Sequence, residues 1–221
     1  MHRAGRILLA GRIEEAERLI HETLALGRMG EVTDELAELI ARLPRMVLLS
    51  SLLALAWCEL DEDEKARDAY EEVAASRFAR MPLDSTWLRG ITDCAAVCAH
   101  LGDTPRATVL SDLLAPSADQ MPVGGLGIAS GSVSHYLALL ATTLGRFDDA
   151  ESRFAAAAQT HEGIGAPTWL ARTRLEWARM LLTRQQHGDG DRARELLGQA
   201  LTAARELGLA NVERQAVELL A

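Results

Sequence analysis

Apolar positions along this chain recur every three to four residues, in segments separated by short turns. The stretch Leu144–Phe154 shows the arrangement best, because one apolar segment ends at Gly145 and another begins near Phe147. Ala150 follows that glycine five residues on, and Phe154 comes four further. Such spacing is typical of amphipathic helices, and glycine can take the left-handed conformation that closes the first of them. The pattern predicts a helical hairpin whose small residues let its two helices approach closely.

The same spacing returns along the chain and predicts four hairpins. Their alanines, Ala66, Ala107, Ala150 and Ala193, are separated by 41, 43 and 43 residues. A register of about 42 residues built from two helices is typical of an α-solenoid. We therefore expect an all-α fold, a right-handed α-solenoid of about 11 to 12 helices in a single domain spanning the chain. The expected hairpins are residues 46–80, 84–115, 130–160 and 167–207, and a terminal helix follows at 211–221.

Residues 1–45 fit this register less well. The distance from Ala16 to Ala66 is 50 residues, which is neither one interval nor two. We expect irregular N-terminal helices in this part, with one helix missing between Met29 and Glu31. An apolar end left exposed by that gap would let two chains stack as a homodimer.

Composition supports closely packed helices and argues against several classes of protein. Apolar residues make up 48% of the chain and aromatic residues 4%, so most of the apolar share is Ala and Leu, the strongest helix formers. A net charge of −9 argues against direct nucleic-acid binding, which needs clustered Lys and Arg. The most apolar run, Met46–Leu60, is shorter than the roughly 20 residues of a membrane span. Cys58, Cys94 and Cys98 are an odd number without a secretory signal, which predicts the reducing cytoplasm.

Three groups of residues resemble catalytic or metal-binding motifs, and packing explains each of them better. The glycines of residues 124–131 lack the preceding strand and the spacing of a phosphate loop, so we interpret them as a linker. Cys94 and Cys98 are four residues apart on a predicted helix, but zinc usually takes four ligands. His135 follows Ser132 without a nucleophile elbow or an ordered triad. We expect no enzyme activity, no bound metal and no cofactor.

Several segments taken together resemble tetratricopeptide repeats of the longer, roughly 40-residue kind. They are Leu83–Leu88, Val97–Asp103, Val123–Gly125, Gly131–Leu137, Leu144–Glu151, Gly165–Thr173 and Ala178–Leu182. As a set they are most similar to the C-terminal repeat region of bacterial ATP-dependent LuxR-type regulators and adenylate/guanylate cyclase-linked predicted ATPases. The cyclase, nucleotide-binding and DNA-binding modules of such proteins are not visible in this sequence. The resemblance therefore implies the repeat scaffold and not those activities.

The resemblance implies a non-catalytic protein-interaction or regulatory scaffold that receives a signal in a transcriptional or signalling regulator. In the tetratricopeptide register the first helices of the hairpins line a concave groove, and its polar residues would be Arg89, Thr92, His135, Thr142, Arg172 and Arg179. The arginines would suit acidic side chains or the C-terminal carboxylate of a partner protein or peptide, including other domains of a larger regulator. In a second interpretation the arginines are solvated helix charges. In a third, the groove holds a metabolite and the chain is a small-molecule sensor.

Overall fold

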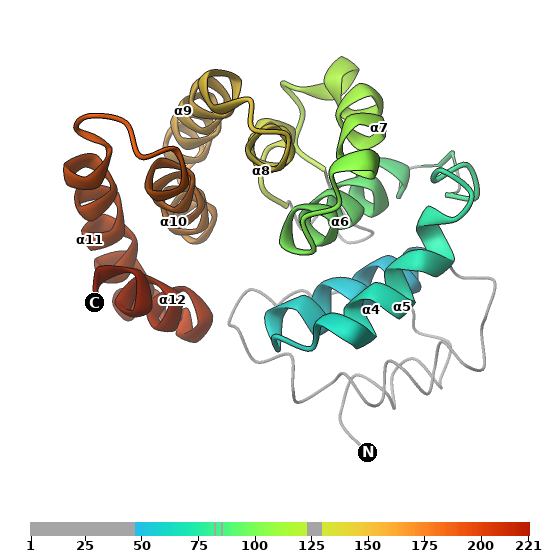
Figure 1. Ribbon diagram of the computed structural model, residues 1–221, viewed down its shortest axis with the longest axis horizontal. Coiled ribbons are helices and arrows are strands. Elements are labelled where there is room, and N and C mark those ends of the chain that lie inside the picture. Colours follow the sequence, from blue (N-terminus) through green and yellow to red (C-terminus); the bar gives the residue numbers. More distant parts are fainter. Residues whose placement is uncertain (1–46, 82, 85, 123–129) are drawn as a thin grey trace.

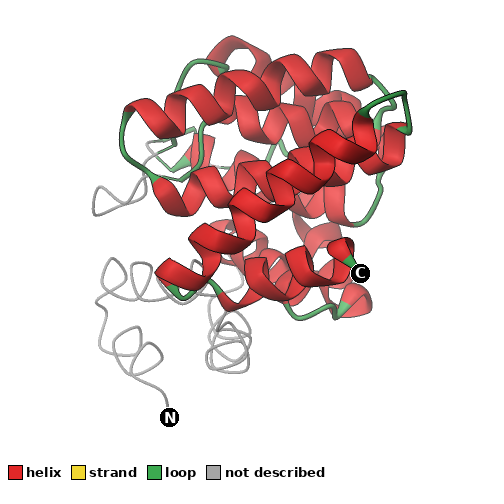
Figure 2. Cartoon of the chain, turned by 90° about the vertical axis from the view of Figure 1, so that its left-hand side faces the viewer, coloured by secondary structure: helices red, strands yellow, loops and turns green. Residues whose placement is uncertain are grey.

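The computed structural model describes residues 47–81, 83–84, 86–122 and 130–221. Within these ranges the chain is helical apart from its turns, and no strand occurs (Figure 2). The helices are α4 (Val47–Glu59), α5 (Asp63–Ala74), α6 (Trp87–His100), α7 (Thr104–Leu114), the 3-10 turn η2 (Ala115–Ser117), α8 (Val133–Thr143), α9 (Phe147–Gly163), α10 (Pro167–Arg184), α11 (Asp189–Leu207) and α12 (Ala210–Leu220). The expected all-α class is confirmed. The predictions for residues 1–45 and for Gly124, Gly125 and Gly127 lie outside the described residues.

Helices pack side by side in consecutive pairs. The closest neighbours are α4 with α5, α8 with α9 and α10 with α11, and α6 packs in the same way on α7 (Figure 1). Each pair then contacts the next through α4 with α6, α6 with α8, and α9 with α10. The buried side chains form two apolar clusters, one running from α4 to α8 and the other from α8 to α12.

The turn residues explain how two helices of a pair come so close. Gly102 and Gly145 have φ angles of +66° and +70°, the left-handed conformation that ends a helix at little cost for glycine. Asp61 takes the same conformation between α4 and α5, with a φ angle of 58°. The four alanines that set the sequence register are fully buried: Ala66, Ala107, Ala150 and Ala193. A methyl group at these positions leaves room for the neighbouring helix backbone, which a larger side chain would displace.

The chain curves around, so that α12 comes back toward α4 (Figure 1). Glu59, at the end of α4, pairs through Oε1 with Nη1 of Arg172 on α10 at 3.0 Å, although the two residues are 113 positions apart. Asn211 on α12 donates a hydrogen bond to the other carboxylate oxygen of Glu59. Arg214 on α12 also reaches Asp61, with 3.1 Å between Nη2 and Oδ2. These polar contacts join α4 and the turn that follows it to α10 and α12.

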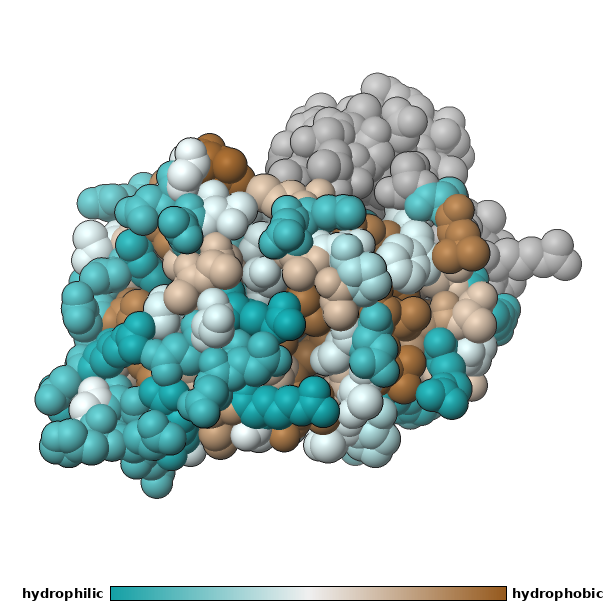
Figure 3. Space-filling model, turned by 90° about the horizontal axis from the view of Figure 1, so that it is seen from above, coloured by the Kyte–Doolittle hydropathy of each residue, from teal (hydrophilic) through white to brown (hydrophobic). Residues whose placement is uncertain are grey.

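Polar side chains cover much of the face seen from above, with smaller apolar areas between them (Figure 3). None of the helices in the described part of the chain combines the length and apolar character that crossing a membrane requires.

Candidate functional site

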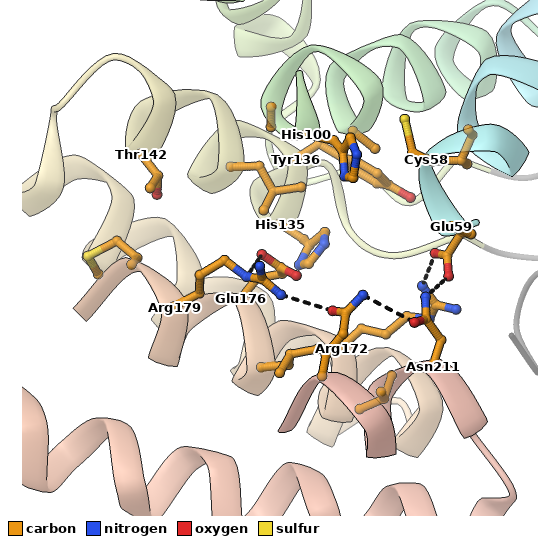
Figure 4. A pocket seen from close by; sticks show the side chains of 18 of the residues that line it. Cys58, Glu59, His100, His135, Tyr136, Thr142, Arg172, Glu176, Arg179 and Asn211 are labelled. Carbon is orange, nitrogen blue, oxygen red and sulfur yellow. Dashed lines mark hydrogen bonds and ion pairs between the residues drawn. The ribbon is translucent and has the colours of Figure 1, made fainter. Parts of the chain in front are cut away.

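A cavity of about 650 Å³ lies at the centre of this arrangement (Figure 4). Side chains from α4, α6, α8, α10 and α12 line it, and we call these five the inner helices. None of its lining residues comes from α7, α9 or α11, and α5 contributes its first residue, Asp63. The alternation follows from the hairpin fold, in which the first helix of each pair faces inward. The volume falls within the roughly 300–1,000 Å³ that is typical of small-molecule sites.

Five of the six residues predicted for the groove line this cavity: Arg89, His135, Thr142, Arg172 and Arg179. The sixth, Thr92, does not line it. Its side chain is fully buried, and its hydroxyl donates to the carbonyl oxygen of Arg89 at 2.8 Å. Three residues advance a helix by about 300°, so Thr92 lies about 60° around α6 from Arg89, enough to turn it into the core. The prediction for Thr92 is therefore corrected.

The arginines of the cavity do not present unmatched positive charge. Nε of Arg89 lies 2.9 Å from Oδ1 of Asp93, and Nε of Arg179 lies 3.4 Å from Oε2 of Glu176. Arg172 is held by Glu59. In total the lining contains four arginines and five carboxylates. Binding of an acidic partner would therefore have to compete with carboxylates that the chain itself supplies.

These arginines also differ in their exposure to solvent. The side chain of Arg89 is 5% exposed and that of Arg172 17%, whereas that of Arg179 is 45% exposed. The interpretation as solvated helix charges therefore suits Arg179 and does not suit Arg89.

A buried polar cluster stands behind the cavity wall, and we call it the histidine cluster: His135 on α8, His161 on α9, Thr173 on α10 and Ser132 before α8. Ser132 donates its backbone N–H to Nε2 of His161 at 2.8 Å. Oγ1 of Thr173 lies 3.1 Å from Nδ1 of His161 and 3.0 Å from Nδ1 of His135. His161 and Thr173 are fully buried and His135 is 4% exposed. The cluster thus ties three helices together from within the core.

The hydrogen bonds of the cluster fix where its protons reside. Nε2 of His161 accepts from a backbone N–H, so in the neutral ring the proton is on Nδ1, which donates to the hydroxyl of Thr173. The hydroxyl hydrogen of Thr173 then has Nδ1 of His135 as its acceptor. Burial lowers the pKa of His135 to about 3, with His161 and Arg172 adding to the effect, and burial lowers the pKa of His161 to about 4. Both rings are therefore neutral at pH 7.

Sequence reasoning missed His161, Thr173, Glu59 and Asn211. For His161 a signal exists, because it extends the buried face of α9 in steps of three and four residues from Ala150, Phe154 and Ala157. A histidine at such a position is enclosed by the core and needs polar partners. The other three carry no comparable local pattern.

An aromatic wall adjoins the histidine cluster and faces the cavity. The ring centroid of Trp169 lies 6.0 Å from that of His135 and 6.3 Å from that of Tyr136. Gly131 supports this wall from behind, since a Cβ atom built on it would lie 2.6 Å from Cε3 of Trp169. The absence of a side chain at Gly131 therefore lets the indole take its place in the cavity lining.

We expect Gly131→Ala to lower the free energy of unfolding by about 1–3 kcal/mol, because the added methyl group must displace the indole of Trp169. Urea unfolding followed by circular dichroism measures this. Gly163→Ala is the matched control, since it adds the same methyl group at the end of α9 where nothing lies within 4 Å. It should leave stability unchanged or raise it by up to about 1 kcal/mol. Equal effects of the two substitutions would contradict the steric role of Gly131.

The described residues contain no group of three or more His, Cys, Asp and Glu side chains arranged to hold a metal ion. Cys94 and Cys98 are fully buried on α6, as expected for packing residues. Burial raises the pKa of Cys98 to about 12 and also that of Cys58, which lines the cavity, to about 12. These thiols are therefore protonated at neutral pH and poorly suited to act as nucleophiles.

No family model matches this chain, and no curated protein matches it. The resemblance to tetratricopeptide-containing regulators therefore stays a prediction from the residues quoted above.

Proposed function

We propose that this chain is a non-catalytic regulatory module and that its central cavity binds a small molecule, so that the protein acts as a sensor. The observation that carries this proposal is the cavity itself, which is lined by side chains from five helices. Beside it, Glu59 bridges α4 to α10 and α12. A molecule bound there would contact helices from both ends of the described chain. Its binding free energy could therefore change how those ends are held together.

The lining offers recognition groups, and three of its hydroxyls are held within their own helices. The hydroxyls of Thr142, Thr143 and Thr183 each donate to the carbonyl oxygen four residues earlier on their own helix, at 2.9, 3.1 and 2.9 Å. A hydroxyl nucleophile needs a base within hydrogen-bond reach, and none of these three has one. This supports the non-catalytic part of the proposal.

We also propose a more detailed assignment of the fold. We interpret the helix pairs as a right-handed α-solenoid of tetratricopeptide-like hairpins, with about 42 residues per repeat. The inner and outer alternation of helices supports it, since in such folds the first helices line the concave surface. We further interpret the chain as the signal-receiving repeat region of a cytoplasmic transcriptional or signalling regulator, on the segments that resemble that family.

A screen of small metabolites by thermal unfolding tests the proposal. A bound compound at 100 times its dissociation constant stabilises the native state by about 2.7 kcal/mol, which a melting curve detects easily. Thr142→Trp should abolish the shift, because the indole would occupy the cavity at a position whose hydroxyl bonds only within its own helix.

Thr202→Trp is the matched control. Thr202 lies on the outer helix α11, is exposed, and makes the same kind of bond to the carbonyl oxygen of Gly198 at 3.0 Å. The melting shift should survive in this variant. The proposal fails if no compound shifts the wild-type melting temperature, or if the shift survives in Thr142→Trp.

A second candidate function is a scaffold that binds a protein or peptide. The rim of the same cavity favours it, because five lining side chains there are 44–65% exposed: Asp61, Asp63, Arg179, Arg214 and Glu218. Native mass spectrometry of the protein purified from its own host separates the two candidates. A bound small mass supports the sensor, and a co-purifying protein whose binding is lost on Arg179→Ala/Arg214→Ala supports the scaffold.

A further inference from the structure

One polar atom in the cavity wall makes no hydrogen bond with the described residues, and it limits the chemistry of the bound molecule. Nδ1 of His135 is engaged by Thr173. Nε2 makes no hydrogen bond with the described residues and is not sealed off within the core, although the residue as a whole is 4% exposed. Figure 4 shows the ring at the edge of the cavity that His135 lines. Nε2 is therefore open to whatever occupies the cavity.

The histidine cluster sets this atom to be a donor. Because Nδ1 of His135 accepts from Thr173, the single proton of the neutral ring is on Nε2. The opposite arrangement would leave the buried hydroxyl hydrogen of Thr173 without an acceptor, a loss of about 1–3 kcal/mol. His161, with both of its nitrogens occupied, maintains this orientation from the far side. The cavity thus contains one directional, uncharged N–H donor.

The surroundings of that donor are aromatic and apolar. The ring of Tyr136 lies 5.2 Å from that of His135 and the indole of Trp169 lies 6.0 Å from it, and both line the cavity with Leu139 and Leu175. Arg172, the charged lining group that lowers the pKa of His135, is already compensated by Glu59. A ligand with its own charge would bring an unpaired ion into this space, which is costly unless a counter-charge is released to meet it.

We propose that the cavity binds an uncharged, largely apolar molecule that carries a carbonyl-type acceptor, placed to receive the hydrogen bond of His135 Nε2 beside the ring of Trp169. The proposal rests on the small-molecule function proposed above and adds the class of ligand. It also makes His135 a specificity-determining residue, with Thr173 and His161 as positioning residues behind it.

A fluorescent probe with these properties tests the proposal on the full chain. The neutral dye 6-propionyl-2-(dimethylamino)naphthalene carries a ketone, and its emission moves to longer wavelength when that ketone accepts a hydrogen bond. Its analogue N,N-dimethyl-2-naphthylamine lacks the ketone, and the anion 8-anilinonaphthalene-1-sulfonate carries a full charge. We expect saturable binding of the ketone dye, with affinity about fivefold above that of the analogue, as one neutral hydrogen bond provides. The anion should bind at least about tenfold more weakly than the ketone dye.

His135→Phe keeps an aromatic ring but removes the donor. It should lower affinity for the ketone dye about fivefold, shift the bound emission to shorter wavelength, and leave affinity for the analogue unchanged. Thr173→Val keeps the imidazole of His135 in the wall but removes the hydroxyl that places its proton on Nε2, so it should lower affinity for the ketone dye by less than His135→Phe does and leave affinity for the analogue unchanged. The wild-type comparison of the three probes stands whether or not either variant folds.

The outcomes separate the two proposals. If none of the three probes binds saturably, the small-molecule cavity and the inference drawn from it both fail. If the probes bind but the anion matches the ketone dye, or the ketone adds no affinity, the small-molecule function survives and the assignment of ligand class is wrong. If His135→Phe weakens the ketone dye and the analogue equally, His135 acts by packing and the role of Nε2 is overturned.

Discussion

Lowering the pH from 7 toward 4 should destabilise the fold steeply, because unfolding releases two imidazoles that the native core keeps neutral. Burial lowers the pKa of His135 to about 3 and that of His161 to about 4, against an ordinary value of 6.5. Below pH 6.5 the unfolded chain binds a proton at each ring and the native state does not. Stability from these groups is therefore complete above pH 6.5 and is lost as the pH falls. The limiting slope is about 1.4 kcal/mol per pH unit for each ring.

Other titratable groups change the free energy of unfolding over other pH ranges or in the opposite direction. Asp189, whose pKa is lowered chiefly by its hydrogen bonds with Arg184, loses its contribution only as the pH falls through and below 3.8. Burial raises the pKa of Asp93, so protonation of this carboxyl favours the native state as the pH falls. The slope between pH 6 and 5 thus reports mainly the two histidines, with Asp93 opposing them.

Urea unfolding at pH 7, 6 and 5 measures the slope directly. His135→Gln/His161→Gln should flatten it, since glutamine keeps donors and acceptors but does not titrate. His187→Gln is the matched control on an exposed turn and should leave the slope as in the wild type. An unchanged slope in the double variant would show that the acid sensitivity arises elsewhere.

Much of this fold follows from local signals that the sequence carries openly. The apolar periodicity located the helices, and the buried alanines Ala66, Ala107, Ala150 and Ala193 mark where they touch. Because the helices pack in pairs along the chain, placing the first helix of one pair on the inner side indicated the same side for the first helices of the others. Five of the six predicted groove residues accordingly line the cavity. The prediction for Thr92 was wrong because a single helix turn contains both cavity-facing and core-facing positions, and a rotation of about 60° separates them.

The contacts between distant parts of the chain could not be predicted, because they depend on the sum of many small rotations from one helix to the next. The contacts of Glu59 with Arg172 and Asn211 join residues 113 and 152 positions apart, so they exist only if every helix pair between them turns by the right amount. The pairing of each arginine of the cavity with a carboxylate of its own chain is equally hidden, although Arg89 and Asp93 stand one helix turn apart. The sequence showed their spacing but not their burial.

Because the Arg89–Asp93 pair is buried, breaking it should have the second large effect on stability. We expect Arg89→Met to lower the free energy of unfolding by about 3–5 kcal/mol, because it leaves the carboxylate of Asp93 unpaired inside the core. The side chains of Arg89 and Asp93 are 5% and 2% exposed, and Arg89 also donates from Nη1 to the hydroxyl of Ser130. Urea unfolding measures the loss. Arg89→Met/Asp93→Leu should recover much of it, since no charge then remains buried.

Arg153→Met is the matched control for the Arg89 substitution. Arg153 pairs with Asp149 at the same separation of four residues and the same 2.9 Å, but these side chains are 30% and 47% exposed. Removing a solvated pair should cost at most about 1 kcal/mol. Equal losses in the two variants would mean that the Arg89 pair contributes no more than a surface pair.

Acidification provides a further check of the same mechanism. Burial already raises the pKa of Asp93 while Arg89 opposes that rise, so removing the arginine must raise it further. A carboxyl whose native pKa is raised favours the folded state as the pH falls. The deficit of Arg89→Met relative to the wild type should therefore shrink between pH 8 and pH 6. If lost packing were the whole cause, the deficit would be the same at both pH values.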